Sequence, residues 1–259
     1  MTKIVIKIGG SLAIDEAKLE DFLRGFAQIT ALPHIKVALV HGGGKDINEN
    51  IALLQEEVNF INGLRVTTPG IMKMVEMTLS GHVNKKLVRM LLAMQCPAVG
   101  ISGVDGQIFS ADKLKAEVDL GQVGDIHSVN PQLIQDLWQS GWTPVVSPIS
   151  YGAEMPFNVN ADTAASELAV ALQADQFILV SDVPGVLDGE KNVIGELDAP
   201  KIATLIDQQI ITGGMIPKVQ ASLDSIERGL KSIHIVGWHS PEHLRQQITG
   251  EENHGSIIR

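Results

Sequence analysis

The stretch IVIKIGG, residues 4–10, decides the fold because it is an apolar run that ends in two glycines. Similar short apolar runs recur along the chain, separated by helical patterns. They lie at residues 4–8, 36–40, 97–101, 143–147, 176–180 and 232–236. Runs that are apolar throughout, rather than alternating with polar residues, are typical of parallel strands covered on both faces. The sequence therefore predicts an open α/β sandwich.

Amphipathic patterns between these runs predict helices. They cover residues 16–28, 46–56, 69–94 (long enough to contain a break), 131–139, 163–173 and 218–228. Residues 103–129 are polar and glycine-spaced, which indicates hairpins and loops, and residues 182–200 indicate an ordered loop near the edge of the sheet. We expect two lobes that share one sheet, with residues 1–157 in the first and 158–259 in the second.

Composition excludes several classes of protein. With 44% hydrophobic and 19% charged residues, the 259-residue chain is typical of folded soluble proteins. A formal charge of -10 argues against nucleic acid or an anionic membrane as a partner. Cys96 is the only cysteine, and no apolar run reaches about 18 residues. We expect a cytoplasmic protein that holds any anionic substrate with local positive groups.

The end of the first strand has a lysine where an anion is expected to bind. Ligands of open α/β sheets lie beyond the carboxyl ends of the strands, next to Lys7. A strand lysine more often packs its stem and extends its ammonium to water. A central strand offers little water, however, and an unpaired buried ammonium costs several kcal/mol. We therefore expect Lys7 to face a bound anion.

A second glycine-rich turn, HGGG at residues 41–44, follows the second strand and precedes a helix. Glycines let the backbone approach a ligand and direct its N–H groups at it, with a helix N-terminus behind them. Glycines also simply make turns, so a single turn is weak evidence. Two turns after successive strands are stronger, and we expect them to face each other across one crevice. Neither forms a P-loop or a dinucleotide fingerprint, and we interpret His41 as structural.

Three further segments place polar residues at predicted helix starts or turns. NVNAD at residues 158–162 precedes a helix that needs one polar N-cap, and the surplus indicates a polar site. GGMIPK at residues 213–218 joins a helix start to Lys218, which suits phosphoryl transfer unless the lysine is merely solvated. Arg65 in NGLRVT, residues 62–67, is either a bidentate carboxylate ligand or an exposed hairpin arginine, and spacing does not decide.

Together these motifs resemble the acetylglutamate kinases of the amino acid kinase family, nearly from end to end. The matching motifs are KxGG at 7–10, HGGG at 41–44, NGLRVT at 62–67, NVNAD at 158–162, SDVxGV at 181–186 and GGMxxK at 213–218. The first and last occur widely in the family, whereas NGLRVT combined with NVNAD looks specific to the acetylglutamate branch. The resemblance implies a three-layer αβα sandwich with a mainly parallel central sheet, the amino acid kinase fold. It also implies an N-terminal lobe that binds N-acetylglutamate and a C-terminal lobe that binds ATP.

The resemblance further implies a role for each motif residue. Lys7 and Lys218 would neutralise the transferring phosphoryl group, and Asp162 would orient both lysines. The acetylated substrate would be bound by Gly43, Gly44, Arg65, Asn158 and Asn160, with Arg65 on its α-carboxylate. The nucleotide would be bound by Gly10, Asp182, Val183, Pro184, Gly185, Val186, Leu187, Ile210, Ile211 and Thr212. Mg²⁺ would be held mainly by the nucleotide phosphates, and no protein metal site is expected.

Two departures from the family pattern bear on assembly and on the C-terminus. Arginine-inhibited members carry an extra N-terminal helix that builds a hexamer, whereas this chain's first strand begins within four residues of Met1. We therefore expect an arginine-insensitive homodimer. The ending GSII at residues 255–258 differs slightly from the usual G-T-x-I, and the sequence assigns no function to the difference.

Three other functions remain open at this stage. A sibling kinase acting on carbamate, glutamate, aspartate or acetylaminoadipate would share the mechanism, and one added methylene is worth only about 1–3 kcal/mol of selectivity. A nicotinamide dehydrogenase would need a fingerprint that the chain lacks. A non-catalytic effector-binding protein would have little use for two lysines and an aspartate placed for phosphoryl transfer.

Overall fold

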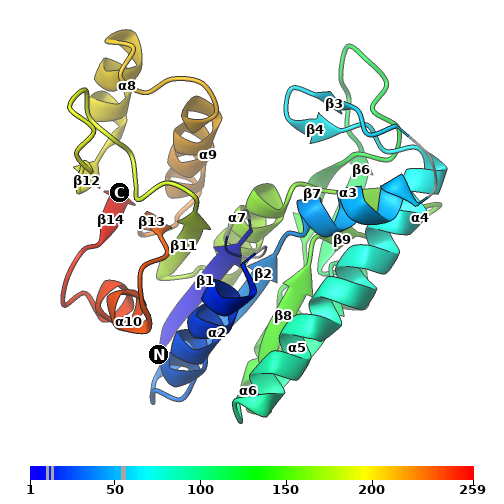
Figure 1. The fold of residues 1–259 in the computed structure, drawn as a ribbon, viewed down its shortest axis with the longest axis horizontal. Coiled ribbons are helices and arrows are strands. Elements are labelled where there is room, and N and C mark those ends of the chain that lie inside the picture. Colours follow the sequence, from blue (N-terminus) through cyan, green and yellow to red (C-terminus); the bar gives the residue numbers. More distant parts are fainter. Residues whose placement is uncertain (10–11, 13–14, 54–56) are drawn as a thin grey trace.

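Figure 1 shows a computed structural model of the chain, which describes residues 1–9, 12, 15–53 and 57–259. Its centre is an eight-stranded sheet. In spatial order the strands are β12 (Glu196–Leu197), β14 (Gly255–Ile258), β13 (Ile233–Gly237), β11 (Gln176–Ser181), β1 (Thr2–Ile8), β2 (Ile35–His41), β8 (Thr143–Ser147) and β5 (Ala98–Ser102). From β13 to β5 every pairing is parallel. At the other edge β14 runs antiparallel to its neighbour β13, and β12 pairs in parallel with β14. The predicted mainly parallel sheet is confirmed.

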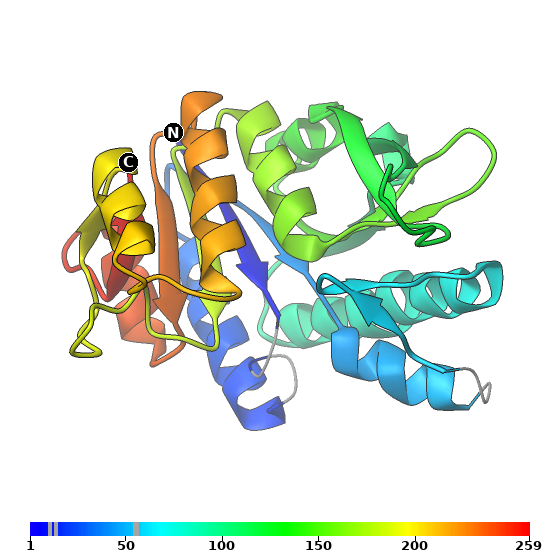
Figure 2. The ribbon, with the colours of Figure 1, turned by 90° about the horizontal axis from the view of Figure 1, so that it is seen from above.

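Helices cover both faces of this sheet, as the view in Figure 2 shows for α2 and α10 on one side and α7 and α9 on the other. The first layer contains α2 (Glu16–Thr30), α5 (Asn84–Ala93) and α10 (Pro241–Thr249). The second contains α6 (Gln132–Gln139), α7 (Ala161–Leu172), α8 (Ala199–Asp207) and α9 (Met215–Glu227). The chain is therefore the three-layer αβα sandwich that the resemblance implied.

Strand β1 shows how the sequence builds two cores. Ile4, Ile6 and Ile8 pack on the α2 side of the sheet, and Val5 packs on the α7 side. Successive strand residues point to opposite faces, so Lys7 shares the α7 face with Val5. This alternation aims the lysine at the N-terminus of α7.

Smaller elements surround the carboxyl ends of the central strands. They are α3 (Gly44–Ala52), α4 (Pro69–Glu76), the 3₁₀ turn η2 (Asp105–Gln107) and three hairpin-like pairs. The pairs are β3 (Phe60–Ile61) with β4 (Leu64–Arg65), β6 (Phe109–Lys113) with β7 (Gly124–Val129), and β9 (Ile149–Ser150) with β10 (Phe157–Asn158). One of these pairs, β6 with β7, lies within residues 103–129, where hairpins and loops were expected.

The long helix expected over residues 69–94 runs on without the possible break, but its hydrogen-bond pattern changes midway. Between α4 and α5 the chain forms a π-helix, η1 (Met77–Val83). Such segments are rare and are often found at functional sites. Its Leu79 lines the cavity described below.

Several elements were not predicted or differ in extent. Helices α8 and α10 and the edge strands β12 and β14 had no prediction of their own, although β12 does lie at the edge of the sheet, as expected for residues 182–200. Helix α3 begins at Gly44 rather than at residue 46, and residues 54–56 of its expected span lie outside the described part of the chain. In the described ranges no helix is long and apolar enough to cross a bilayer.

Candidate active site

A cavity of about 240 Å³ opens at the carboxyl ends of β1 and β2. Both predicted glycine turns contribute to it, through Gly9 and through residues 42–44, so the expected common crevice is confirmed. Seven of the predicted site residues line the cavity: Lys7, Gly43, Gly44, Arg65, Asn158, Asn160 and Asp162. Segments far apart in the sequence therefore meet where open α/β sheets bind ligands.

Lys7 is held at the edge of this cavity by its strand and by Gly9. Its side chain is 13% exposed, and its Nζ lies 2.8 Å from Asp162 Oδ1. A Cβ atom on Gly9 would lie 2.6 Å from the same Nζ, so the ammonium crosses over the glycine. The first glycine turn thus leaves room for the lysine head.

Asp162 joins two lysines from different parts of the chain. Its Oδ2 lies 3.4 Å from the Nζ of Lys218, which the first turn of α9 presents. Burial by itself would raise the pKa of Asp162, but Lys7 and Lys218 outweigh it and lower the pKa below 3.8. Asp162 is therefore ionised at neutral pH, and the group of three carries a net positive charge. Asn160 caps α7 by accepting a hydrogen bond from the Asp162 N–H at 2.8 Å.

Arg65 is buried, so it is not the exposed hairpin arginine that the sequence left open as one alternative. Only 7% of it is exposed, its guanidinium lies 4.7 Å from the centre of the Phe60 ring, and burial lowers its pKa. Its Nη2 donates a long hydrogen bond to Gly44 O at 3.4 Å, while its buried Nη1 has no partner among the described residues. A buried guanidinium with an unused donor facing a cavity suits an anionic ligand.

The arginine hairpin is tied to the NVNAD segment by a residue that the sequence analysis did not single out. Thr67 is fully buried, and its hydroxyl donates to Arg65 O at 2.8 Å and accepts from Asn158 Nδ2 at 3.0 Å. The hairpin turns at Asn62 and Gly63, both with positive φ, as an Asn-Gly turn requires. Thr67 therefore fixes Arg65 relative to Asn158.

The second glycine turn packs against the π-helix. A Cβ on Gly43 would lie 2.7 Å from Leu79 Cδ2, so a larger residue would have to displace that side chain. Gly44 begins α3 and has open space on its Cα, which leaves the helix N-terminus facing the cavity. Phe60 and Leu79 line the same cavity without having been predicted, because neither belongs to a polar or glycine motif.

His41 is held in its neutral form beneath this turn. It is 1% exposed, its Nδ1 bonds to Gly42 O at 2.9 Å, and its Nε2 accepts from Asn84 Nδ2 at 3.1 Å. Burial lowers its pKa to about 4. His41 thus supports the turn from below instead of facing the cavity.

The residues predicted to bind the nucleotide lie elsewhere. Residues 182–187 follow β11, and residues 210–212 precede α9; none of them lines the cavity. Val186 and Ile211 are buried in the core on the α7 side. The side chains of these two residues are therefore not open to a ligand. Gly10, predicted for the same role, lies outside the described residues.

Among the described residues, no group of three or more His, Cys, Asp or Glu side chains is placed to hold a metal ion. Asp162 is the acidic residue in the described lining of the cavity, and both of its oxygens face lysines. A divalent cation brought to this site would therefore meet no free carboxylate in that described lining.

Comparison with known proteins identifies the class. The model of the Amino acid kinase family matches residues 2–237. The chain therefore belongs to the amino acid kinase family.

Within that family, its sequence is similar to acetylglutamate kinases. The acetylglutamate kinase of Clostridium kluyveri is 38% identical, with 98% of this chain and 91% of the relative covered. That of Gloeobacter violaceus is 39% identical, with 98% and 86% covered. The predicted resemblance is confirmed, as is the prediction of a kinase.

Solved structures share the fold. A Streptococcus mutans protein aligns with a TM-score of 0.79 and 29% identity, covering 99% of this chain and 98% of that one. The N-acetylglutamate synthase of Neisseria gonorrhoeae aligns with a TM-score of 0.86 and 19% identity over 99% of this chain and 59% of that one. At that identity the second likeness shows the fold alone.

The buried histidine yields a prediction about pH. Because the folded-state pKa of His41 lies near 4, below its ordinary value of 6.5, the unfolded chain binds a proton more readily as pH falls. The stability that neutral His41 contributes is therefore fully present above pH 6.5 and is lost as the pH falls from there toward 4. Between pH 6 and 5 this one group lowers the free energy of unfolding by about 1 kcal/mol. In urea unfolding, the free energy of unfolding of His41→Gln should fall less than that of the wild type between pH 6 and 5, by that amount.

The control is His127→Gln, on the exposed face of β7. It shows how far a His→Gln substitution without burial changes the pH dependence of the free energy of unfolding. An equal reduction in both variants, or no reduction in His41→Gln, would contradict the assignment.

Proposed function

We propose that this protein transfers the γ-phosphoryl group of MgATP to the side-chain carboxylate of N-acetyl-L-glutamate. The product is N-acetyl-L-glutamyl 5-phosphate, which would make the reaction the second step of arginine biosynthesis. The proposal rests on the family, on the similarity to acetylglutamate kinases and on the charge arrangement of the site. No covalent enzyme intermediate is involved.

One observation carries the mechanism: two lysines share one carboxylate at the mouth of the cavity. In a protein of formal charge -10, this leaves a local positive charge where the phosphoryl group would pass. Phosphoryl transfer spreads negative charge over the equatorial oxygens, and fixed positive groups stabilise that charge. Lys7 and Lys218 would supply it, and Asp162 would hold both ammonium groups in place.

The nucleophile explains why no general base is needed. The side-chain carboxylate of N-acetylglutamate is already ionised at neutral pH, so catalysis reduces to positioning and charge neutralisation. Arg65 would bind the α-carboxylate of the substrate through its unused Nη1 donor. Gly43, Gly44, Asn158 and Asn160 surround the same cavity and would complete the substrate site.

For the nucleotide we propose residues 182–187, which follow β11, and residues 210–212, which precede α9 and its Lys218. Mg²⁺ would be held mainly by the phosphates, because the carboxylate of Asp162 already faces two lysines. Bound there, the cation would neutralise phosphate charge. We further propose a two-lobed protein divided near Asn158 and a cytoplasmic homodimer, whose mass light scattering would establish.

The proposal is tested by trapping acyl phosphate with hydroxylamine in the presence of MgATP. The candidate acceptors are N-acetylglutamate, N-acetylaminoadipate, glutamate, aspartate and carbamate. Strong preference for N-acetylglutamate is expected. Turnover of another acceptor would keep the kinase chemistry and refute the substrate, whereas no product from any acceptor would refute the kinase.

Removing the first lysine should abolish most of the activity. Lys7→Ala should reduce kcat by about 10²–10³, or about 2.7–4 kcal/mol, as loss of a preorganised donor does. Lys3→Ala is a matched control, because Lys3 lies on the same strand and face but at the other end of β1. Lys7→Ala with kcat within about tenfold of wild type, a difference of about 1.4 kcal/mol, would remove Lys7 from the mechanism.

Replacing the buried arginine with lysine keeps the positive charge but removes the two parallel N–H donors of the guanidinium. Arg65→Lys should raise the KM for N-acetylglutamate by about 10- to 100-fold, the worth of a hydrogen bond to a charged group, and leave the KM for MgATP unchanged. Steady-state kinetics with each substrate varied would show the split. Arg89→Lys, on the exposed side of α5, is the control, and equal changes in both KM values would count against a carboxylate contact.

A further inference from the structure

The loop of residues 182–187 is packed against the ends of two strands with no room for additional side chains. A Cβ on Gly237, the last residue of β13, would lie 3.0 Å from the Cα of Pro184. A Cβ on Gly185 would lie 2.8 Å from the Oγ of Ser256 on β14. The backbone of this loop is therefore positioned by direct contact with the strands.

Ser256 makes the polar part of this contact. It is fully buried, and its hydroxyl accepts a hydrogen bond from the Val186 N–H at 2.8 Å and approaches Val186 O at 3.5 Å. Val186 O also accepts from the Ile194 N–H at 2.8 Å. The buried Ser256 side chain thus contacts both the N–H and the carbonyl group of Val186.

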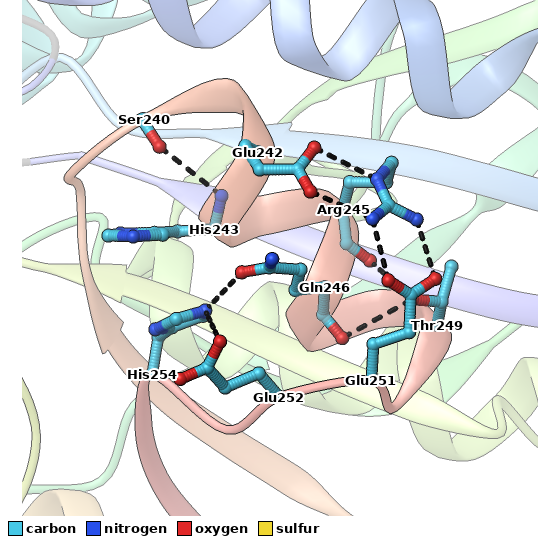
Figure 3. Close-up of polar contacts among 9 residues, drawn as sticks. All are labelled: Ser240, Glu242, His243, Arg245, Gln246, Thr249, Glu251, Glu252 and His254. Carbon is cyan, nitrogen blue, oxygen red and sulfur yellow. Dashed lines mark hydrogen bonds and ion pairs between the residues drawn. The ribbon is translucent and has the colours of Figure 1, made fainter.

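Strand β14 is itself firmly anchored, so it serves as a fixed reference for the loop. Figure 3 shows His254, just before β14, stacked on His243 and bonded to Gln246 of α10; the ring centres are 4.0 Å apart and the Nε2–Oε1 distance is 2.6 Å. Arg245 bridges Glu242 and Glu251 across the turn that leads into the strand. Helix α10 therefore fixes the segment that leads into β14, and pairing with β12 and β13 holds the strand itself.

We infer that Ser256 is a positioning residue for the nucleotide: its hydroxyl sets the backbone of residues 182–187 against bound ATP. The inference rests on the proposed nucleotide role of this loop. Without the hydroxyl, the buried Val186 N–H loses its partner, and the loop must shift to satisfy it. The acceptor site is built from other segments, namely the hairpin β3–β4, α3 and the start of α7, and is left unchanged.

The test compares Ser256→Ala with the hydroxyl-retaining Ser256→Thr. Ser256→Ala should raise the KM for MgATP by about three- to tenfold, the worth of one neutral hydrogen bond, with the KM for N-acetylglutamate unchanged. Ser256→Thr should restore much of the loss. Thr143→Val is the matched control, because it removes a buried hydroxyl at the amino end of β8, opposite the site.

Titration of wild-type protein with MgATP comes first and separates the two possible failures. A wild type that does not bind MgATP would refute the proposed function. A wild type that binds it, together with a folded Ser256→Ala that binds it equally well, would overturn this inference alone. Equal rises in both KM values, or no recovery in Ser256→Thr, would also overturn it, since a general loss of rigidity in the protein predicts these results.

If Ser256→Ala does not fold, Ser256→Cys takes its place. Cysteine has about the same side-chain volume as serine but is a weaker hydrogen-bond acceptor, and the variant is judged by the same criteria.

Discussion

The ion pair between Lys7 and Asp162 is the constraint on which the rest of the site depends. A lysine on a central strand is cut off from water, and its ammonium is costly unless a carboxylate lies close by. Strand alternation points it at α7, the N-cap Asn160 fixes where that helix begins, and Asp162 in the first turn meets it at 2.8 Å. Gly9 must then be small enough for the ammonium to pass over it. Strand, turn and helix start are thus coupled through one interaction.

Much of this could be predicted because the signals are local. Uninterrupted apolar runs predicted the parallel strands, and glycines directly after two of them predicted turns at the same edge of the sheet. The surplus of polar residues in residues 158–162 separates as expected into a helix cap, Asn160, and a charge partner, Asp162. Each of these features depends on the order of residues within a few positions, which the sequence displays directly.

The remaining features depend on contacts between distant segments. Whether Arg65 was exposed could not be decided, since its burial comes from Phe60 and from α3 across the cavity. Thr67 matters because Asn158 lies beside it, 91 positions away in the chain. Helix α10 buries only Leu244, Gln247 and Ile248, too few apolar residues for a strong periodic pattern. The π-helix keeps helical spacing while shifting which residues face the cavity.

The two lysines are not equivalent, and the difference has a physical meaning. Lys7 is 13% exposed and 2.8 Å from its partner, whereas Lys218 is 34% exposed and 3.4 Å away. The less exposed pair is screened less by solvent, so its geometry is the more strongly fixed. Lys218 lies in the first turn of α9, shortly after residues 210–212, and its longer and more exposed contact costs less to rearrange. In the proposed mechanism, Lys7 would be the positive charge already fixed before a ligand binds, and Lys218 the one that adjusts to it.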